Sequence, residues 1–244
     1  MYRVGSRLAN ASVLFRKQYV PRHHSLGSSR DQKFTFTVLR NDVANAFVLP
    51  GNHVFVYSGL FKYTRNEDEL AAVLAHEMGH TLARHAGERI SGSLLVAFLA
   101  RLTLLIDPSG FLYSIFLPSA SLLHDLPNSR EAEVEADQIG IHLAAEACYD
   151  PRAASNVFRA MKEENTSSPP QFLSTHPSYD TRLANFSSPS IMGKPLSRFN
   201  ENNGRRCSGV RKQMWEARKA AAFRAKEKES TIKQKEKFFK AKTN

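Results

Sequence analysis

The stretch LAAVLAHEMGHTLARH, residues 70–85, constrains the fold of this chain more than any other part of its sequence. Six apolar residues lead into His76, Glu77 and His80, so a segment with the composition of a buried helix carries ionisable side chains. A polar or charged group that is buried without a partner costs several kcal/mol. The fold must therefore expose these side chains to water or give them a common partner.

The spacing of the two histidines favours a common partner. His76 and His80 are four residues apart, so on a helix they lie on one face, one turn apart, and can bind one small cation. Glu77 is rotated from His76 by about 100° and can reach a water molecule bound to that ion. Two neutral imidazoles and one carboxylate suit Zn²⁺ and leave a fourth position open. HExxH also occurs by chance in unrelated chains, but the apolar surroundings here predict a zinc site with one ion per chain.

A second helical segment, SREAEVEADQIG, offers the carboxylate. On a helical wheel, Glu133 and Asp137 border the apolar arc and are again four residues apart. The other polar residues fall on the opposite, solvated face: Glu131, Glu135, Gln138, His142 and Glu146. Glu133 is the predicted third ligand, and Asp137 is placed to accept a hydrogen bond from the free nitrogen of a ligating histidine. The alternative is that both carboxylates lie at the edge of a surface patch.

The segment before the HEMGH helix has the pattern of strands. Residues 34–39 predict one strand, and AFVLPGNHVFVYS predicts two more, joined through residues 50–52. The helix should begin near Thr64 or Asn66, because each of these residues is followed by a glutamate at the spacing of a capping box. A small sheet is therefore expected beside the helix.

Residues 94–123 are the most hydrophobic part of the chain. Two apolar runs of about thirteen residues flank residues 107–110, and each is shorter than the roughly 20 residues that a spanning helix needs. Arg101 also interrupts the first run. We expect a helical hairpin that covers the core or dips into a bilayer, without a clean transmembrane span. The second ligand helix should begin after it, near Ser129, and end near Cys148.

The net charge of +11 is concentrated at the two ends. Residues 1–30 contain six Lys or Arg and no acid, which is typical of a mitochondrial presequence; the alternative is a basic first helix or a disordered arm. Residues 194–244 contain 16 basic and five acidic residues without an apolar stripe, which predicts a solvated or partner-dependent tail that would suit acidic phospholipid. The middle of the chain is mildly acidic and carries no nucleic-acid-binding motif, so no nucleic-acid partner is expected.

HEMGH, followed about fifty residues later by SREAEVEAD, resembles the HtpX and CAAX-prenyl-protease group of zinc metallopeptidases. The resemblance covers roughly residues 34–186 and is strongest to the mitochondrial inner-membrane branch of that group. It implies that His76, His80 and Glu133 bind zinc and that Glu77 is the catalytic base. It also implies an α+β, mainly helical gluzincin-type fold, with a small β-sheet packed on the HEMGH helix and a second zinc-ligand helix.

The charge distribution and the resemblance together divide the chain into a basic arm (1–33), a metallopeptidase domain (34–193) and a basic tail (194–244). It implies an endopeptidase for membrane-associated or misfolded proteins in mitochondrial quality control. Relatives in this branch carry a membrane-spanning segment ahead of the catalytic helix, where this chain has only the basic arm. The anchor would then be the 94–123 hairpin, or the protein would be peripheral to the inner membrane.

Further residues are expected to act on the substrate. By their family position, His176 and Arg182 would stabilise charge on the substrate carbonyl; the alternative is a capping histidine and a surface arginine. The strand pair AFVLPGNHVFVYS would offer an edge to an extended polypeptide. Its expected substrate-binding residues are Asn45, Phe47, His53 and Phe55. His85, five residues after His80, should point to a different face and not be a ligand.

Two other functions stay open at this point. One is a bacterial-type envelope quality-control protease, although the chain lacks the long apolar stretch of a secretory signal at its start. The other is a metal-stabilised scaffold or chaperone without turnover, although a purely structural site has no use for Glu77. The sequence leaves a homo-oligomer possible.

Overall fold

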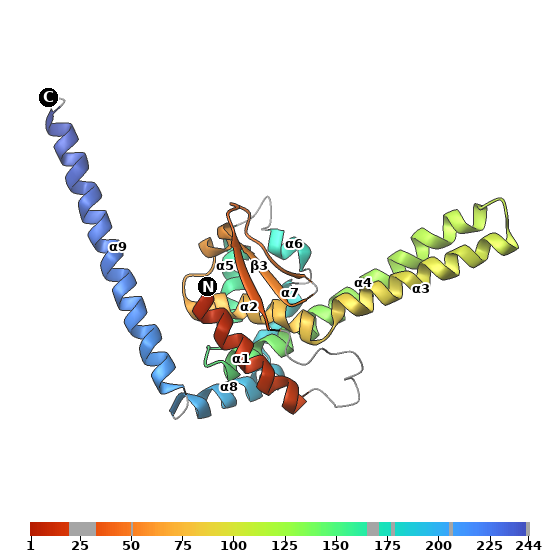
Figure 1. Ribbon diagram of the computed structural model, residues 1–244, viewed down its shortest axis with the longest axis horizontal. Coiled ribbons are helices and arrows are strands. Elements are labelled where there is room, and N and C mark those ends of the chain that lie inside the picture. Colours follow the sequence, from red (N-terminus) through yellow and green to blue (C-terminus); the bar gives the residue numbers. More distant parts are fainter. Residues whose placement is uncertain (20–32, 50, 165–170, 177–178, 205–206, 243–244) are drawn as a thin grey trace. The chain divides into compact units, whose positions relative to one another are not determined.

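The computed structural model describes residues 1–19, 33–49, 51–164, 171–176, 179–204 and 207–242. It divides into two compact units, residues 1–199 and 200–244. The elements, drawn in Figure 1, are α1 (Tyr2–Tyr19), β1 (Thr35–Leu39), β2 (Ala46–Leu49), β3 (His53–Tyr57), a 3-10 helix (Ser58–Lys62), α2 (Glu67–Leu82), α3 (His85–Ile106), α4 (Phe111–Glu146), α5 (Ala153–Glu164), α6 (Gln171–Thr175), α7 (Tyr179–Ser187), α8 (Pro189–Gly204) and α9 (Ser208–Lys242). The expected mainly helical α+β fold with a small sheet is confirmed.

The basic N-terminal segment forms a packed helix. Val4, Leu8, Ala11 and Phe15 are buried at the spacing of one helical face, and α1 contacts α2, α4 and β1. The alternative of a basic first helix is therefore what the structure shows for α1. Mitochondrial targeting stays a prediction, and residues 20–32 lie outside the described part of the chain.

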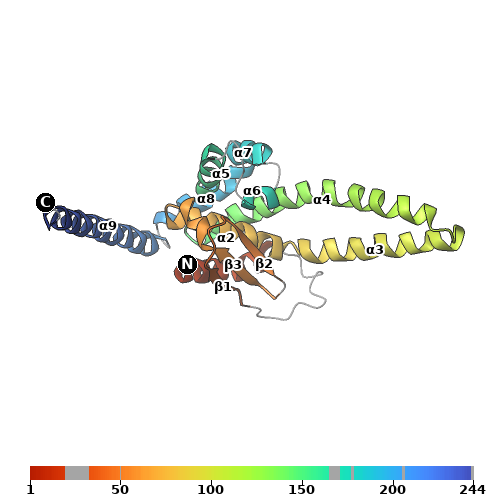
Figure 2. The ribbon, with the colours of Figure 1, turned by 90° about the horizontal axis from the view of Figure 1, so that it is seen from above.

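The three predicted strands form one sheet in the order β1-β3-β2. β3 is central; it pairs with β1 in parallel and with β2 in antiparallel register. Gly51 and Asn52 have φ angles of 92° and 66°, in the left-handed region that lets the chain reverse between β2 and β3. β2 and β3 both contact α2, so the edge strand β2 lies over the helix that carries HEMGH (Figure 2).

The start of α2 matches the second of the two predicted caps. The side chain of Asn66 accepts a hydrogen bond of 3.0 Å from the backbone N–H of Glu69. The Glu69 carboxylate in turn accepts one of 2.6 Å from the backbone N–H of Arg65. Polar groups at the helix end are thereby satisfied, and most of α2 can be buried.

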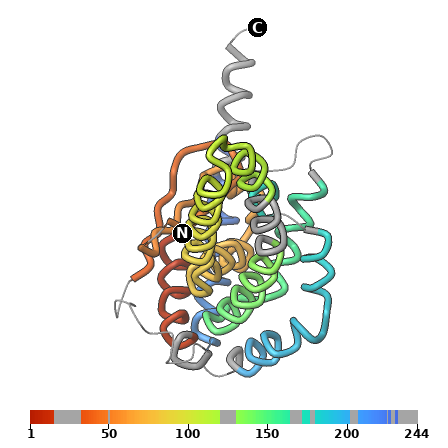
Figure 3. The backbone as a smooth tube through the Cα atoms, turned by 90° about the vertical axis from the view of Figure 1, so that its right-hand side faces the viewer, coloured from red at the N-terminus to blue at the C-terminus, as the bar shows by residue number. Residues whose placement is uncertain are grey.

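The hydrophobic hairpin differs from the prediction in the length of its helices. α3 has 22 residues, and α4 begins at Phe111 and continues without a break to Glu146, so the second ligand helix does not begin near Ser129. Both helices are longer than the apolar runs: α3 begins before the first run, at His85, and α4 continues after the second run, to Glu146. α4 continues through Pro118 and Pro127, although proline lacks the N–H of an interior helical hydrogen bond, and it contacts α3. Figure 3 shows this pair end-on.

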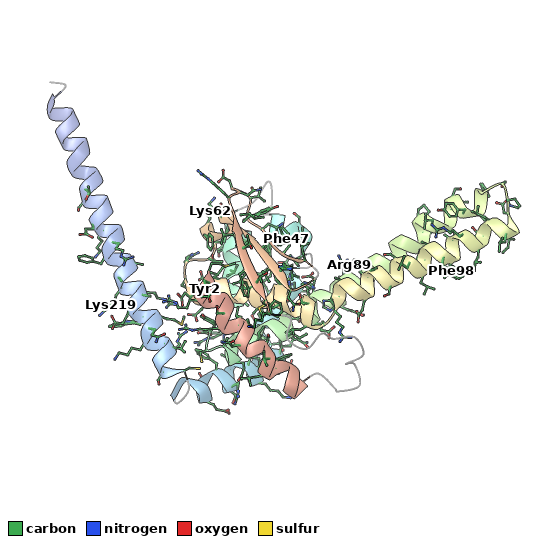
Figure 4. The ribbon with its side chains drawn as sticks, viewed as in Figure 1. Tyr2, Phe47, Lys62, Arg89, Phe98 and Lys219 are labelled. Carbon is green, nitrogen blue, oxygen red and sulfur yellow. The ribbon has the colours of Figure 1, made fainter. Side chains whose placement is uncertain are left out.

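The hairpin does not cover the core. α3 has a mean hydropathy of 1.7 over its most apolar 18 residues, and only 6% of that window is buried. It is therefore long and apolar enough to cross a membrane, which corrects the prediction that the first arm is too short to span. Figure 4 labels Arg89 and Phe98 along this helix.

The second unit contains most of the basic tail, and α9 is its long helix. α9 has 35 residues and is rich in Ala, Lys, Arg and Glu, which have high helix propensity. It lacks an apolar stripe, as predicted; Trp215 is 53% exposed, and Lys219 one turn later lies 3.5 Å from its ring centroid.

Candidate metal centre

The two histidines of HEMGH face each other within α2. Nε2 of His76 lies 3.1 Å from Nε2 of His80, and the rings are nearly perpendicular. His76 is 3% exposed and Glu77 is 2% exposed. Two imidazole nitrogens this close, in a buried position, are placed to share one cation.

Glu133 reaches the same point from α4. Its carboxylate oxygens lie 3.3 Å from Nε2 of His76 and 3.4 Å from Nε2 of His80. This convergence requires α2 and α4 to pack closely, and two glycines permit it. A Cβ on Gly79 would lie 2.6 Å from the backbone oxygen of Ala136, and one on Gly140 would lie 3.0 Å from the backbone nitrogen of His76.

Asp137 pairs with Nδ1 of His76, the ring nitrogen that faces away from the candidate metal site. Its Oδ1 lies 2.9 Å from Nδ1 of His76. Because Nε2 of His76 faces the other candidate ligands, the proton of the neutral ring is on Nδ1, and this N–H donates a hydrogen bond to Asp137. The predicted position of Asp137, one turn beyond Glu133 and next to a ligating histidine, agrees with this geometry.

His176 comes from the end of α6 and enters the cluster itself. Its Nδ1 lies 3.0 Å from Oε1 of Glu133 and 3.2 Å from Nε2 of His76, and its Nε2 lies 3.2 Å from Oε1 of Glu77. The ligand atoms of His76, His80, Glu133 and His176 all lie within 4.8 Å of one another. Sequence reasoning proposed His176 as a carbonyl donor and missed it as a possible fourth ligand. The only sign of this ligand in the sequence is the histidine itself, in the segment STHPSYD.

Arg182 is fully buried rather than a surface residue. Its Nε and NH2 donate to the two carboxylate oxygens of Asp137, both at 2.7 Å, and its NH1 lies 2.9 Å from the Glu133 carboxylate. NH1 also lies 3.3 Å from the backbone oxygen of His176, and the guanidinium stacks over Phe158 at 4.3 Å. Arg182 thereby fixes both carboxylates from α7; its role as a donor to substrate stays a prediction.

The ionisation of Glu133, Asp137 and His80 suits a metal. Burial acts to raise the pKa of Glu133, but hydrogen bonds from the neighbouring histidines outweigh it and hold that pKa well below its usual range. Burial also opposes ionisation of Asp137, yet the charge of Arg182 lowers its pKa. Burial lowers the pKa of His80 and so favours the neutral imidazole. Ionised carboxylates and neutral histidines are the forms that bind metal ions.

Glu77 has the properties of a proton acceptor. Burial acts to raise its pKa, but the charge of His176 and a hydrogen bond from it, with smaller contributions from the other two histidines, lower it. Its Oε1 is buried and lies 3.2 Å from Nε2 of His176. The residues present therefore fit a metal ion with an ionised carboxylate beside it.

His85 is outside the ligand cluster, as predicted, but it does not point away from the site. Its Nδ1 lies 2.8 Å from Nδ1 of His80, and its Nε2 lies 3.2 Å from the carboxylate of Glu135. The helical spacing failed here because α2 ends at Leu82 and Arg84 adopts a φ of 64° before α3 begins.

The expected substrate-binding residues are divided between two strands. Phe47 lies on the edge strand β2 and stacks on Phe55 of the central strand β3, with ring centroids 5.4 Å apart. His53, also on β3, has its Nδ1 2.6 Å from Oγ1 of Thr35 on β1. Asn45 is buried, and its side chain accepts from the backbone N–H of Ala46. In the described sheet, β3 is paired on both sides, whereas β2 lies at the edge.

Comparison with known proteins identifies the family. A model of peptidase family M48 matches residues 17–190. The chain belongs to peptidase family M48. Membership in M48 implies a metal ion at the site formed by His76, His80 and Glu133.

Curated M48 relatives from fungi, plants and bacteria resemble the chain. It is 41% identical over 177 residues to the mitochondrial metalloendopeptidase OMA1 of Schizosaccharomyces pombe, a match that covers 70% of this chain and 51% of that protein. It is 34% identical over 169 residues to the Arabidopsis thaliana OMA1, covering 67% and 33%. It is 32% identical over 180 residues to the beta-barrel assembly-enhancing protease of Escherichia coli, covering 67% and 36%. The matched region is about half of these relatives' length or less.

Proposed function

We propose that this M48 chain is a zinc-dependent endopeptidase, with one zinc ion per chain, that hydrolyses peptide bonds of membrane-associated or misfolded proteins in mitochondrial quality control. The observation that carries the proposal is the buried cluster of His76, His80 and Glu133 with Glu77 beside it. Two imidazoles and one carboxylate are the ligand set of many catalytic zinc sites. The mitochondrial location rests on similarity to proteins named as mitochondrial OMA1.

The residues around the metal have different roles in peptide hydrolysis. Zinc, when bound, supplies a Lewis acid that makes water a nucleophile near neutral pH and polarises a carbonyl. Glu77 accepts the proton that the attacking water loses and gives it to the leaving amine. Its lowered pKa keeps it ionised for the first of these steps. Asp137 and Arg182 hold His76 and Glu133 in place.

The edge strand β2 is the proposed binding site for an extended polypeptide. Among the described residues β2 pairs with β3 on one side only, and it contacts α2, which carries the two histidine ligands. An extended substrate can add to this edge by backbone hydrogen bonds and pass over the metal. Such binding depends little on side chains, so access to the site would control cleavage more than sequence would.

The α3–α4 hairpin is the proposed membrane contact. Large apolar side chains on both arms are exposed to solvent, among them Leu94, Phe98, Leu105 and Phe111. At 1.5 Å per residue, the 22 residues of α3 extend about 33 Å, which is comparable with the thickness of the hydrocarbon core of a bilayer. Both ends of the hairpin return to the catalytic unit, so insertion would hold the metal centre at the membrane surface.

Vesicle flotation tests the membrane contact. Wild-type protein should float with vesicles that contain acidic phospholipid, and the double variant Leu95→Glu, Phe98→Glu should remain below with the soluble fraction. Val43 and Phe61 are exposed apolar residues outside the hairpin, so Val43→Glu with Phe61→Glu is the matched control and should float. Equal flotation of the two double variants would contradict the contact.

The peptidase activity is tested by measuring bound zinc and cleavage of an unfolded reporter protein for wild type and Glu77→Gln. One zinc per chain in both, with cleavage at least about 100-fold slower in the variant, is the expected result. Glu88→Gln, which changes an exposed glutamate of α3, is the control and should cleave as wild type does. Absence of zinc from the wild type would refute the proposal.

One observation favours a second function, a metal-stabilised scaffold without turnover. His176 is close enough to act as a fourth protein ligand, and zinc with four protein ligands is typical of structural sites. A scaffold would hold zinc in wild type and in Glu77→Gln, and would cleave in neither. The same measurement therefore distinguishes the two functions.

A further inference from the structure

A line of hydrogen-bonding groups leads away from the metal centre on the side of His80. Nδ1 of His80 lies 2.8 Å from Nδ1 of His85, and Nε2 of His85 lies 3.2 Å from Oε2 of Glu135. His85 is buried, whereas the side chain of Glu135 is 60% exposed. The line therefore runs from the half-buried ligand His80 to a carboxylate at the surface.

The position of each proton along this line follows from the geometry. Nε2 of His80 faces His76 and Glu133, so it is the atom that binds the metal and carries no proton. Nδ1 of a neutral His80 must then carry the proton and donate it. Nδ1 of His85 is the acceptor, so the proton of His85 is on Nε2, which donates to Glu135.

The backbone is bent to build this contact. A continuous helix would carry a residue five positions after His80 to another face. Instead, α2 ends at Leu82, and Arg84 takes a left-handed φ of 64° that returns the chain toward the site. A non-glycine residue in this conformation costs about 1–2 kcal/mol. The fold thus sustains local strain at the point that places His85 against a metal ligand.

We propose that His85 and Glu135 are positioning residues, which orient His80 and fix its tautomer for metal binding. His76 already has such a partner in Asp137. Among the described residues, the partner of Nδ1 of His80 is His85, which itself contacts the carboxylate of Glu135. Partners of this kind raise the basicity of a ligating histidine and hold its ring. This inference rests on the metal site of the proposed function, but not on the peptidase activity.

Metal affinity, measured by competition with a chelator, tests the pair without reference to cleavage. His85→Phe keeps a ring but removes the acceptor, and it should weaken zinc binding by about 10- to 100-fold. His85→Asn places an oxygen near the position of Nδ1 and should recover most of that loss. Glu135→Gln should weaken binding less than His85→Phe does. Glu131→Gln, which alters an exposed glutamate of the same helix, should leave the affinity unchanged.

A second measurement uses the wild-type protein, so it does not depend on whether a variant folds. The ¹⁵N chemical shifts of imidazole nitrogens distinguish a protonated from a bare nitrogen. In zinc-loaded wild type we expect a bare Nδ1 and a protonated Nε2 on His85, and a protonated Nδ1 on His80. A proton on Nδ1 of His85, or wild-type affinity in His85→Phe, would overturn the inference. If the wild-type protein binds no zinc, the metal centre itself is refuted.

Discussion

Gly140 on α4 lies directly against the backbone of His76 on α2. A Cβ at Gly140 would be 3.0 Å from the nitrogen and 3.1 Å from the Cα of His76. The neighbouring atoms are backbone, so they cannot move aside without shifting a helix. The distance between the two ligand helices, and with it the distance from Glu133 to both histidines, therefore depends on the absence of a side chain at this position.

The first prediction concerns this contact. Gly140→Ala should destabilise the protein by about 1–3 kcal/mol, because overpacking forces the helices apart, and it should weaken metal binding as well. Gly87→Ala is the control: its Cβ would meet no atom within 4 Å, so the better helix propensity of alanine should raise stability by about 0.5–1 kcal/mol. Denaturant unfolding and chelator competition measure both effects. Equal behaviour of the two variants would contradict the packing argument.

The second prediction concerns the buried guanidinium of Arg182. Arg182→Met keeps much of the volume but leaves Asp137 and Glu133 without their cation, which should cost about 3–5 kcal/mol. Arg198 pairs with Glu146 at 2.8 Å, but its side chain is 46% exposed. Arg198→Met should therefore cost less than about 1 kcal/mol. Unfolding free energies of the two variants that differ by less than about 1 kcal/mol would show that Arg182 does not stabilise the carboxylates.

The third prediction concerns the pH dependence of the metal-free protein. Burial alone would lower the pKa of His176, but the charges of Glu77 and Glu133 outweigh it and raise the pKa to about 9. Since the unfolded pKa is about 6.5, the stabilisation from charged His176 is fully present below that pH and is lost as the pH rises toward 9. The loss should reach at most about 3 kcal/mol.

Unfolding of chelator-treated protein between pH 6 and pH 9 measures this effect. His176→Gln removes the titrating group, so its stability should change much less over the same range. A variant that loses stability as steeply as the wild type would assign the effect to another residue.

The sequence predicts the metal centre well because its main features are local. His76 and His80, and likewise Glu133 and Asp137, are each one helical turn apart, so helical periodicity alone brings each pair to one face. The apolar arcs of the two helices then indicate which face is buried. The cap at Asn66 and the reversal between β2 and β3 depend on short-range patterns in the same way.

The features that the sequence did not reveal depend on tertiary packing. Helical spacing predicts that His85 lies on another face than His80, but the left-handed backbone of Arg84 places it next to His80. A lone arginine in a loop-like segment gives no sign that α7 will bury it against α4. The start of α4 was placed too late because the second apolar run and the ligand segment that begins near Ser129 were predicted as separate helices, whereas α4 continues through both.

The last prediction tests the edge of the sheet. Tyr57 donates its backbone N–H to the backbone oxygen of Asn45, and hydrogen-bonded pairs alternate along an antiparallel ladder. Counting from that pair, Phe47 and Leu49 bond to β3, and the N–H of Val48 points to the open edge. Val48→Pro should therefore remove a donor to the substrate without breaking the β2–β3 ladder.

One lost backbone hydrogen bond is worth about 1 kcal/mol, so kcat/KM for an unfolded reporter should fall about fivefold in Val48→Pro. Val48→Ala keeps the N–H and removes most of the side chain, so it separates backbone from side-chain effects and should retain wild-type kcat/KM. Zinc content and thermal unfolding should be unchanged in both variants. If Val48→Pro cleaves as fast as Val48→Ala while both are folded, substrate does not add to β2, and the polypeptide must reach the metal by another route.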